Sequence, residues 1–212
     1  MSRASQPSVA PGCTAPTPVT YADDARGEVP APSLTDFHVL IDPDDSAKWY
    51  DGASQGHNFG FAGSGDDEEE YLAPKAGTFA GGYVVDDVFA NFDAAKAHAL
   101  LRITLPQNSA APCDTTAGFT ISVTGHAEAT VTYLLHANNQ LSISSSTTTV
   151  TSGNNAMTVV AIENLTPGGL ATVVGTKTGC KINPIVRPMN DLGTIPLEAG
   201  RVVAMPYQVA PM

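Results

Sequence analysis

Apolar and polar residues alternate along much of the chain between residues 118 and 163. From Phe119 to Val123 every second side chain is apolar, and hydroxyl-bearing residues lie between them. Successive side chains of a β-strand point to opposite faces, so this period of two predicts a strand with one buried face. The segment from His126 to His136 repeats the pattern and predicts a second strand.

Turn-forming residues separate the predicted strands. Gly125 lies between the first two strands, and the pair Asn138-Asn139 follows the second. Asparagine tolerates the positive φ angles of a tight hairpin turn, so we expect a hairpin at this pair. Beyond it, the sequence predicts further strands from Leu141 to Val150 and from Met157 to Ile162.

Shorter apolar runs extend the pattern over the rest of the chain. They predict strands at residues 37–41, 77–92, 99–105, 170–176, 181–186, 192–197 and 201–207. Residues 93–100 could instead form two helical turns capped by Asn91. Short strands at roughly ten-residue spacing indicate an all-β fold. We therefore expect an antiparallel β-sandwich resembling a jelly roll, although the strand count is equally compatible with an immunoglobulin-like sandwich.

Two segments near the N-terminus lack this periodicity. Residues 1–35 contain six prolines, and proline fixes φ and lacks a backbone donor, so an extended arm is predicted in which neither a helix nor a central strand forms. Residues 36–212 then form a single β-sandwich domain. Within it, residues 42–74 form a long loop rich in glycine and acidic side chains. Long loops are usually functional or ordered by a partner, which makes Trp49, Tyr50, Phe59 and Phe61 candidate interaction residues.

Charge is distributed unevenly along the chain, whose formal net charge is -11. Residues 1–102 hold 16 of the 21 acidic residues and six of the ten basic residues. In residues 103–212 only about 8% of residues are charged, against roughly 25% in an ordinary soluble domain. The centres of subunit interfaces are depleted in charged residues, so we expect neighbouring subunits to cover this half. The alternative is that its abundant Ser, Thr and Asn residues provide the solvation.

The acidic balance argues against direct binding to nucleic acid or to an anionic membrane, because both rely on Lys and Arg. No apolar run reaches the roughly 18 residues of a membrane-spanning helix. The segment from Met1 to Thr20 lacks the basic start and apolar centre of a signal peptide. A chain without a membrane segment or an export signal is therefore expected.

Short motifs indicate no reaction. Gly52-Ala53-Ser54-Gln55-Gly56 matches the G-x-S-x-G pattern of serine hydrolases, but no helix-forming segment follows it. Asp42, Asp44 and Asp45 are a candidate calcium site, although the glycine and glutamate that complete an EF-hand loop are missing. We therefore predict no catalytic residue, no cofactor and no small-molecule substrate.

Three cysteines, Cys13, Cys113 and Cys180, lie far apart in the sequence. Their odd number leaves at least one thiol free or paired between chains. Sequence separation cannot establish a disulfide, so reduced cysteines are the simpler expectation. If a bridge exists, Cys113 and Cys180 are the better candidates because both lie in the predicted β-domain.

These observations favour a non-enzymatic structural subunit of a large assembly. The hypothesis is a bacteriophage or viral virion protein, such as a capsid, cement or head-decoration protein, assembled in the host cytoplasm. Its partners would be further copies of the chain, other shell proteins, or both. The alternative is a carbohydrate-binding or adhesion-type β-sandwich module in which Trp49, Tyr50, Phe59 and Tyr71 stack on sugars.

Overall fold

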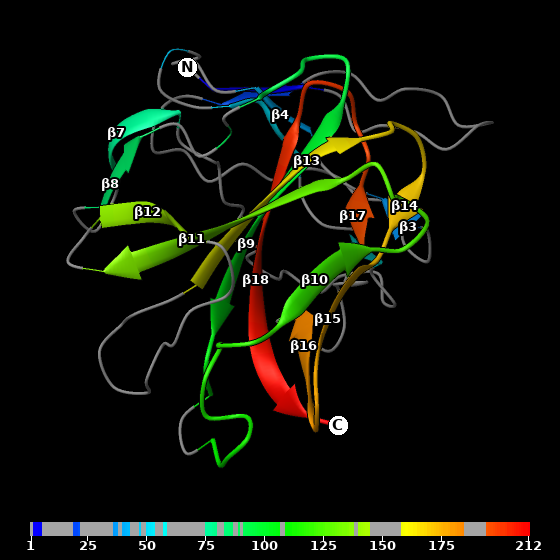
Figure 1. Ribbon diagram of the computed structural model, residues 1–212. Helices are drawn as coiled ribbons and strands as arrows, with labels where there is room; N and C mark the ends of the chain where they lie inside the picture. The colour runs from blue at the N-terminus through cyan, green and yellow to red at the C-terminus, as the bar shows by residue number, and fades with distance from the viewer. Residues whose placement is uncertain are drawn as a thin grey trace.

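The fold is known from a computed structural model, which describes part of the chain. The described residues are 2–5, 19–21, 36–37, 40–42, 47, 50–53, 57–58, 75–79, 83–86, 89, 91–106, 109–137, 140–144, 158–184 and 194–212. Within these ranges the regular structure consists of β-strands, and no helix occurs (Figure 1). The all-β prediction is therefore confirmed.

Seven strands form the centre of the main sheet. In the order in which they pair, they are β11 (Thr130–Ala137), β13 (Thr158–Leu165), β9 (Ala97–Thr104), β18 (Val202–Pro211), β16 (Cys180–Pro184), β15 (Val173–Lys177) and β10 (Thr120–Val123). The sheet is nearly closed, because β10 returns to the side of β11. There the Ile121 N–H donates a hydrogen bond to the Tyr133 hydroxyl at 3.2 Å.

Shorter strands extend this sheet or form small separate sheets. Next to β11 lie β12 (Gln140–Ser144), β8 (Tyr83–Asp86) and β7 (Ala76–Phe79). Next to β18 lie β5 (Gly52–Ala53), β4 (Leu40–Asp42), β1 (Ser2–Ser5) and β2 (Val19–Tyr21). Two separate pairs are β14 (Leu170–Ala171) with β17 (Ile195–Pro196), and β3 (Asp36–Phe37) with β6 (His57–Asn58).

The main sheet is mixed, which corrects the expectation of an antiparallel sandwich. β18 runs parallel to β9, from the pair Val202↔His98 to the pair Gln208↔Thr104. Parallel neighbours need a crossover connection, and the intervening strands β10 to β17 supply it. The other pairs among the seven central strands are antiparallel. A nearly closed mixed sheet does not confirm the two-sheet jelly roll.

Part of the expected N-terminal arm pairs within the sheet. β1 lies between β2 and β4 and is antiparallel to both, which corrects the expectation that no central strand forms before residue 36. Ser2–Ser5 contains no proline, so none of its positions lacks an N–H donor. Arg201 joins the same region to β18, because its Nη1 lies 2.7 Å from Asp42 Oδ1 and donates a hydrogen bond to the Gly52 carbonyl at 3.1 Å.

The helix considered for residues 93–100 does not form. Residues 93–96 make a turn in which the Lys96 N–H donates to the Asp93 carbonyl at 2.9 Å, and strand β9 begins directly afterwards. The Asp93 carboxylate also accepts a hydrogen bond from the Ala95 N–H at 2.8 Å. Aspartate favours such local side-chain to backbone bonds over helix, which explains the turn.

The strand expected from His126 begins only at Thr130, where β11 starts. Gly125 has a φ of +80°, a conformation that glycine adopts readily and other residues rarely do. Two backbone hydrogen bonds follow it, from the His126 N–H to the Val123 carbonyl and from the Ala129 N–H to the His126 carbonyl. A turn therefore replaces the first part of the expected strand.

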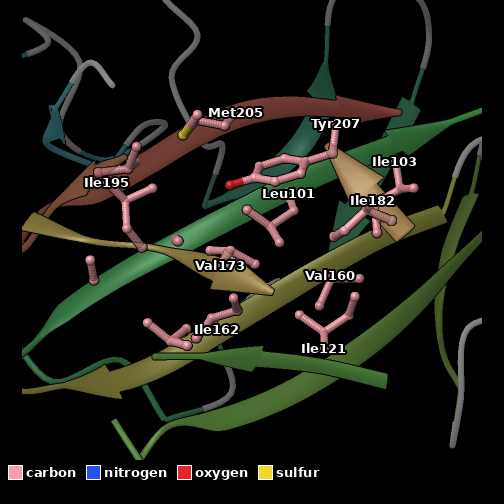
Figure 2. Packing of buried hydrophobic residues seen from close by; sticks show 14 of the residues in the cluster. Leu101, Ile103, Ile121, Val160, Ile162, Val173, Ile182, Ile195, Met205 and Tyr207 are labelled. Atoms are coloured by element: carbon pink, nitrogen blue, oxygen red, sulfur yellow. The ribbon is translucent and has the colours of Figure 1, made fainter. Parts of the chain in front are cut away.

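The inside of the curled sheet is a packed apolar core. Alternate side chains of each strand point inward, as the period of two requires. Figure 2 shows the labelled core side chains facing one another, namely Leu101 and Ile103 of β9, Val160 and Ile162 of β13, Met205 and Tyr207 of β18, and Ile121, Val173, Ile182 and Ile195 of β10, β15, β16 and β17. All of them are at most 6% exposed. Full burial of one such side chain contributes about 1.5–3 kcal/mol.

Candidate functional site

A second apolar cluster covers the opposite face of β9 and β13. It consists of Tyr50, Phe89, Leu134, Val159, Ala161 and Val202, with Phe92 and Leu100 packed against it. The Tyr50 side chain is 6% exposed, and its ring centroid lies 5.3 Å from that of Phe89 and 4.6 Å from that of Phe92. Tyr50 thus takes part in internal packing. The other aromatic candidates, Trp49, Phe59, Phe61 and Tyr71, lie outside the described residues.

Two ionisable side chains are buried beside this cluster. His98 is 1% exposed and stacks on Phe92 at 4.5 Å between ring centroids. Its Nε2 lies 2.9 Å from the Asp93 carbonyl oxygen, and a carbonyl only accepts, so Nε2 carries a proton. Glu163, also 1% exposed, accepts a hydrogen bond from the Asn91 N–H at 2.9 Å. Both contacts hold the turn at residues 91–96 against the sheet, which is a structural role.

The described residues contain no group of three metal-ligating side chains that could hold an ion. Of the calcium candidates, the Asp42 carboxylate pairs with Arg201, whereas Asp44 and Asp45 lie outside the described residues. Ser54 of the G-x-S-x-G sequence lies outside them as well, and the preceding Gly52–Ala53 forms β5. Neither sequence signal is thus assembled into a site by the described part of the chain.

Cys113 and Cys180 form a disulfide, with sulfur atoms 1.96 Å apart. The sequence favoured reduced cysteines, and this prediction is wrong for Cys113 and Cys180. The bridge joins the loop before β10 to the first residue of β16 across 67 residues of sequence. Both cysteines are at most 4% exposed, so the bond lies inside the core.

The outer surface of β10 and β15 is the most distinctive exposed feature of the described residues. Along the chain from Leu170 to Thr176 exposed and buried residues alternate, with Ala171, Val173 and Gly175 buried. β10 pairs with β15 so that Thr120 lies opposite Thr176 and Ser122 opposite Val174. The ladder continues where the Thr124 N–H donates to the Thr172 carbonyl at 3.0 Å. We call this surface, made of Thr120, Ser122, Thr124, Thr172, Val174 and Thr176, the β10–β15 face.

The β10–β15 face carries no ionisable side chain. Its members bear hydroxyl or methyl groups only. Strand β16 pairs with the other edge of β15 and adds one exposed charge, Lys181, opposite Thr176. The chain as a whole carries a net charge of -11, but only five of its 21 acidic residues lie in residues 103–212, to which both strands belong. The sequence indicated that residues 103–212 carry few charges. The pairing of β10 with β15 identifies one exposed face of this half that has no ionisable side chain.

A few large apolar side chains are also exposed. Among the described residues the exposed large hydrophobic residues are Leu170, Val174 and Met212, at 48%, 38% and 78% exposure. Leu170 is the first residue of β14, which pairs with β17 in a separate sheet, and Val174 is the second residue of β15. Met212 lies beyond its end, because the Met212 N–H donates to the carbonyl of Gly179, in the turn between β15 and β16, at 3.1 Å. Val174 is thus the one exposed large hydrophobic residue among the hydroxyl groups of the face, and Leu170 and Met212 lie on neighbouring parts of the described chain. The face therefore presents hydroxyl groups and one exposed valine side chain to its surroundings.

Comparisons with known proteins do not add to this geometry. Protein-family models, curated proteins and solved structures gave no match to the chain. In the described ranges there is no helix of the length and apolarity needed to cross a bilayer.

Proposed function

We propose that this chain is a non-enzymatic structural subunit of a bacteriophage or viral particle, acting as a capsid, cement or decoration protein. Its function is to stabilise the shell through contacts with other subunits. The observation that carries the proposal is the β10–β15 face, which combines neutral hydroxyl groups with the exposed side chain of Val174. The other exposed large hydrophobic residues of the described chain, Leu170 and Met212, lie outside this face.

The chemistry of this face favours association over catalysis. Burying an apolar side chain is favourable, whereas burying an unpaired charge is costly. A face with methyl and hydroxyl groups can be covered by a partner without leaving an ion buried, because each hydroxyl both donates and accepts. The charge-poor second half of the sequence is thereby accounted for, since its exposed strands need not face water in the assembly.

The Cys113–Cys180 disulfide supports the same proposal. Disulfides persist on virion surfaces and outside cells, and they are rare in proteins that stay in the cytosol. A shell protein that is built in a cell and then acts outside it can form and keep such a bridge. The virion is therefore the proposed location of the mature protein.

The test is to purify the protein from its native source under non-reducing conditions and to measure the mass of the object with which it travels. Density-gradient sedimentation followed by mass spectrometry of each fraction gives this directly. The proposal predicts that the chain sediments with particles of viral mass at a fixed ratio to the other shell proteins. Recovery of the chain only as a monomer, in every fraction and at every concentration tested, would contradict it.

Two variants that add the same charge at different places test whether the β10–β15 face makes the contact. Val174→Asp adds one carboxylate to the β10–β15 face and is expected to abolish association with the particle. Ala95→Asp adds the same charge at an exposed turn before β9 and should leave association unchanged. Circular dichroism and thermal unfolding of both variants would show that the fold is retained.

A further inference from the structure

We infer that the Cys113–Cys180 disulfide is a redox latch, which holds β10 and the loop before it against the sheet when oxidised and lets them open when reduced. The inference goes beyond the proposed function, because it concerns the redox state of this chain alone. β10 supplies Thr120 and Ser122 of the β10–β15 face. The latch therefore also controls whether this face is fully formed.

β10 is the most weakly paired of the seven central strands. With four residues it is the shortest of them. In the part of the chain that the structure describes, its backbone pairs with β15 alone, whereas each of the other six pairs with at least two strands. On its free edge the Ile121 N–H donates to the Tyr133 hydroxyl. Segments with few backbone partners open locally at a lower free energy than the rest of a fold.

The same strand is needed to close the core. Phe119, Ile121 and Val123 point inward and are at most 5% exposed. Opening of β10 would therefore expose apolar side chains on both sides of the gap, which is unfavourable in water. A strand that covers the core but pairs along one edge is the place where an added constraint has the largest effect.

The disulfide supplies this constraint next to β10. Cys113 lies seven residues before Thr120, the first residue of β10, and Cys180 is the first residue of β16. β16 pairs with both β15 and β18, so the bridge ties the loop to the well-paired part of the sheet. With the bridge closed, only residues 114–119 can move out with β10. Without it the whole connection, residues 105–119, is released and gains more conformational entropy on opening.

The other contacts of this loop are few and weaker. Among residues 109–118 two side chains are buried, those of Cys113 and Thr116. The Thr116 hydroxyl lies 2.7 Å from the Thr158 hydroxyl on β13. The Lys177 ammonium group donates to a backbone carbonyl of the loop at 3.2 Å. A covalent bond at one of the two buried positions is thus the principal anchor of the loop.

The latch closes by a two-electron exchange with a small disulfide such as oxidised glutathione. The Cys113 thiolate attacks this disulfide, forms a mixed disulfide and releases one glutathione thiol, and the Cys180 thiolate then displaces the second. The two protein thiols lose two electrons and two protons, and the two glutathione thiols receive them. Once formed, the bridge is at most 4% exposed at either cysteine, so a reductant reaches it only when the loop opens. Closure is therefore fast to complete and slow to reverse.

Hydrogen exchange at single backbone amides tests the latch. The full chain carrying Cys13→Ser is measured with the bridge intact and again with Cys113 and Cys180 both replaced by alanine. The reporter is the Thr124 amide, which donates to the Thr172 carbonyl at 3.0 Å and continues the β10–β15 ladder. Loss of the bridge should speed exchange at this amide at least about tenfold more than at the amides of β9 and β13.

Val203→Ala is the matched control, because it weakens the core at a distance from the bridge. Val203 is 1% exposed on β18 and lies eight residues before Pro211, which pairs with Cys180. This substitution lowers the stability of the whole fold and should speed exchange in β9 and β13 at least as much as at Thr124. If the double alanine variant does not fold, Cys113→Ala alone, kept under a thiol reductant, takes its place because Cys180 then stays in the core.

A redox titration completes the test. The Cys13→Ser chain, refolded under a thiol reductant, should exchange at Thr124 as fast as the alanine variant, and oxidised glutathione should restore slow exchange. An equal rise in exchange throughout the sheet would overturn the latch, because the bridge would then act on global stability only. Failure of oxidation to slow exchange at Thr124 would overturn it as well. Neither measurement needs a partner, so the latch can fail while the association with particles, measured separately, still holds.

Discussion

The Tyr133 hydroxyl accepts a hydrogen bond from the Ile121 N–H at 3.2 Å, and this contact joins β11 to β10 at the seam of the curled sheet. The backbone ladder of β10 runs along β15 on its other side. A side chain of β11 thus satisfies a backbone donor of β10 that points away from β15. The Tyr133 phenol therefore helps to hold the seam next to the β10–β15 face.

Tyr133→Phe should destabilise the protein by about 1–2 kcal/mol, because the Ile121 N–H loses its acceptor in a partly buried place. Urea unfolding should show a lower midpoint at unchanged slope. Hydrogen exchange at the Ile121 amide should become faster than at Ser122, whose N–H points to β15. An unchanged midpoint together with unchanged exchange at Ile121 would contradict the proposed role of the phenol.

Tyr207→Phe is expected to behave in the opposite way. The Tyr207 ring is fully buried, and its hydroxyl has no hydrogen-bond partner in the part of the chain that the structure describes. Removing a buried, unsatisfied hydroxyl is neutral or stabilising. This substitution therefore serves as a control for Tyr133→Phe, since both remove one phenolic oxygen from the same core. A loss of more than about 1 kcal/mol would show that the Tyr207 hydroxyl makes a stabilising contact.

Burial also raises the pKa of Tyr207 above its usual value of 10.0. Above pH 10 the unfolded chain releases this proton while the folded chain retains it, so stability falls as the pH rises past 10. Tyr207→Phe lacks the titrating group and should lose less stability over this range. Thermal unfolding of both proteins between neutral and strongly alkaline pH measures the difference.

Much of the fold follows from local pattern. The alternation at residues 119–123 predicted β10, and Asn138-Asn139 predicted the turn between β11 and β12, whose ends Ala137 and Gln140 are paired. The parallel pairing of β18 with β9 was not predictable, because it joins segments distant in sequence through contacts that no local pattern records. The burial of β13 on both faces was not predictable for the same reason. Both of its faces are buried, one by the core and the other by the cluster around Tyr50 and Phe89.

The sequence predicted only part of the candidate site. Composition indicated a half with few charges, and the hydroxyl groups of β10 were already apparent beside Phe119, Ile121 and Val123. The face itself requires β10 to lie beside β15, some fifty residues later in the chain. This is a long-range contact, which periodicity does not encode.

The Glu128 carboxylate should titrate with a midpoint of about 2, well below its ordinary value of 4.5. The principal cause is the hydrogen bond with the His126 side chain at 2.9 Å, followed by backbone bonding of Glu128 itself and the Thr166 hydroxyl at 2.8 Å. A lowered pKa contributes stability above pH 4.5, and that contribution is lost as the pH falls toward 2. Carboxyl chemical shifts followed by NMR give the midpoint. His126→Ala removes the principal cause and should move the pKa of Glu128 back toward 4.5.

The number of reactive thiols tests the Cys113–Cys180 disulfide. With Cys113 bonded to Cys180, only Cys13 of the three cysteines remains. The denatured chain should therefore show one reactive thiol before reduction and three after it. Replacing both Cys113 and Cys180 by alanine should lower the free energy of unfolding by about 2–5 kcal/mol, because the bridge closes a long loop. Three thiols in the unreduced, denatured protein would contradict the bridge.

Gly175 connects the core to the β10–β15 face, because it lies on β15 next to Val174 with its backbone against the core. A Cβ atom at this position would overlap Ile182 Cγ1 and Cδ1 on β16, and would lie 2.9 Å from Ile121 Cδ1 on β10. Gly175→Ala should therefore cost about 1–3 kcal/mol through overpacking. It should also weaken association, since relief of the overlap moves β15 outward and disturbs the face.

A double substitution distinguishes overpacking from a backbone effect. Ile182→Ala removes the two overlapping atoms and alone should cost about 2–5 kcal/mol through the cavity that it leaves. In the double variant the new methyl group fills part of this cavity, so the combined loss should be smaller than the sum of the single losses. Urea unfolding of the four proteins measures this coupling, and light scattering shows whether association recovers with packing. If the two losses are strictly additive, the loss caused by Gly175→Ala does not come from overlap with Ile182.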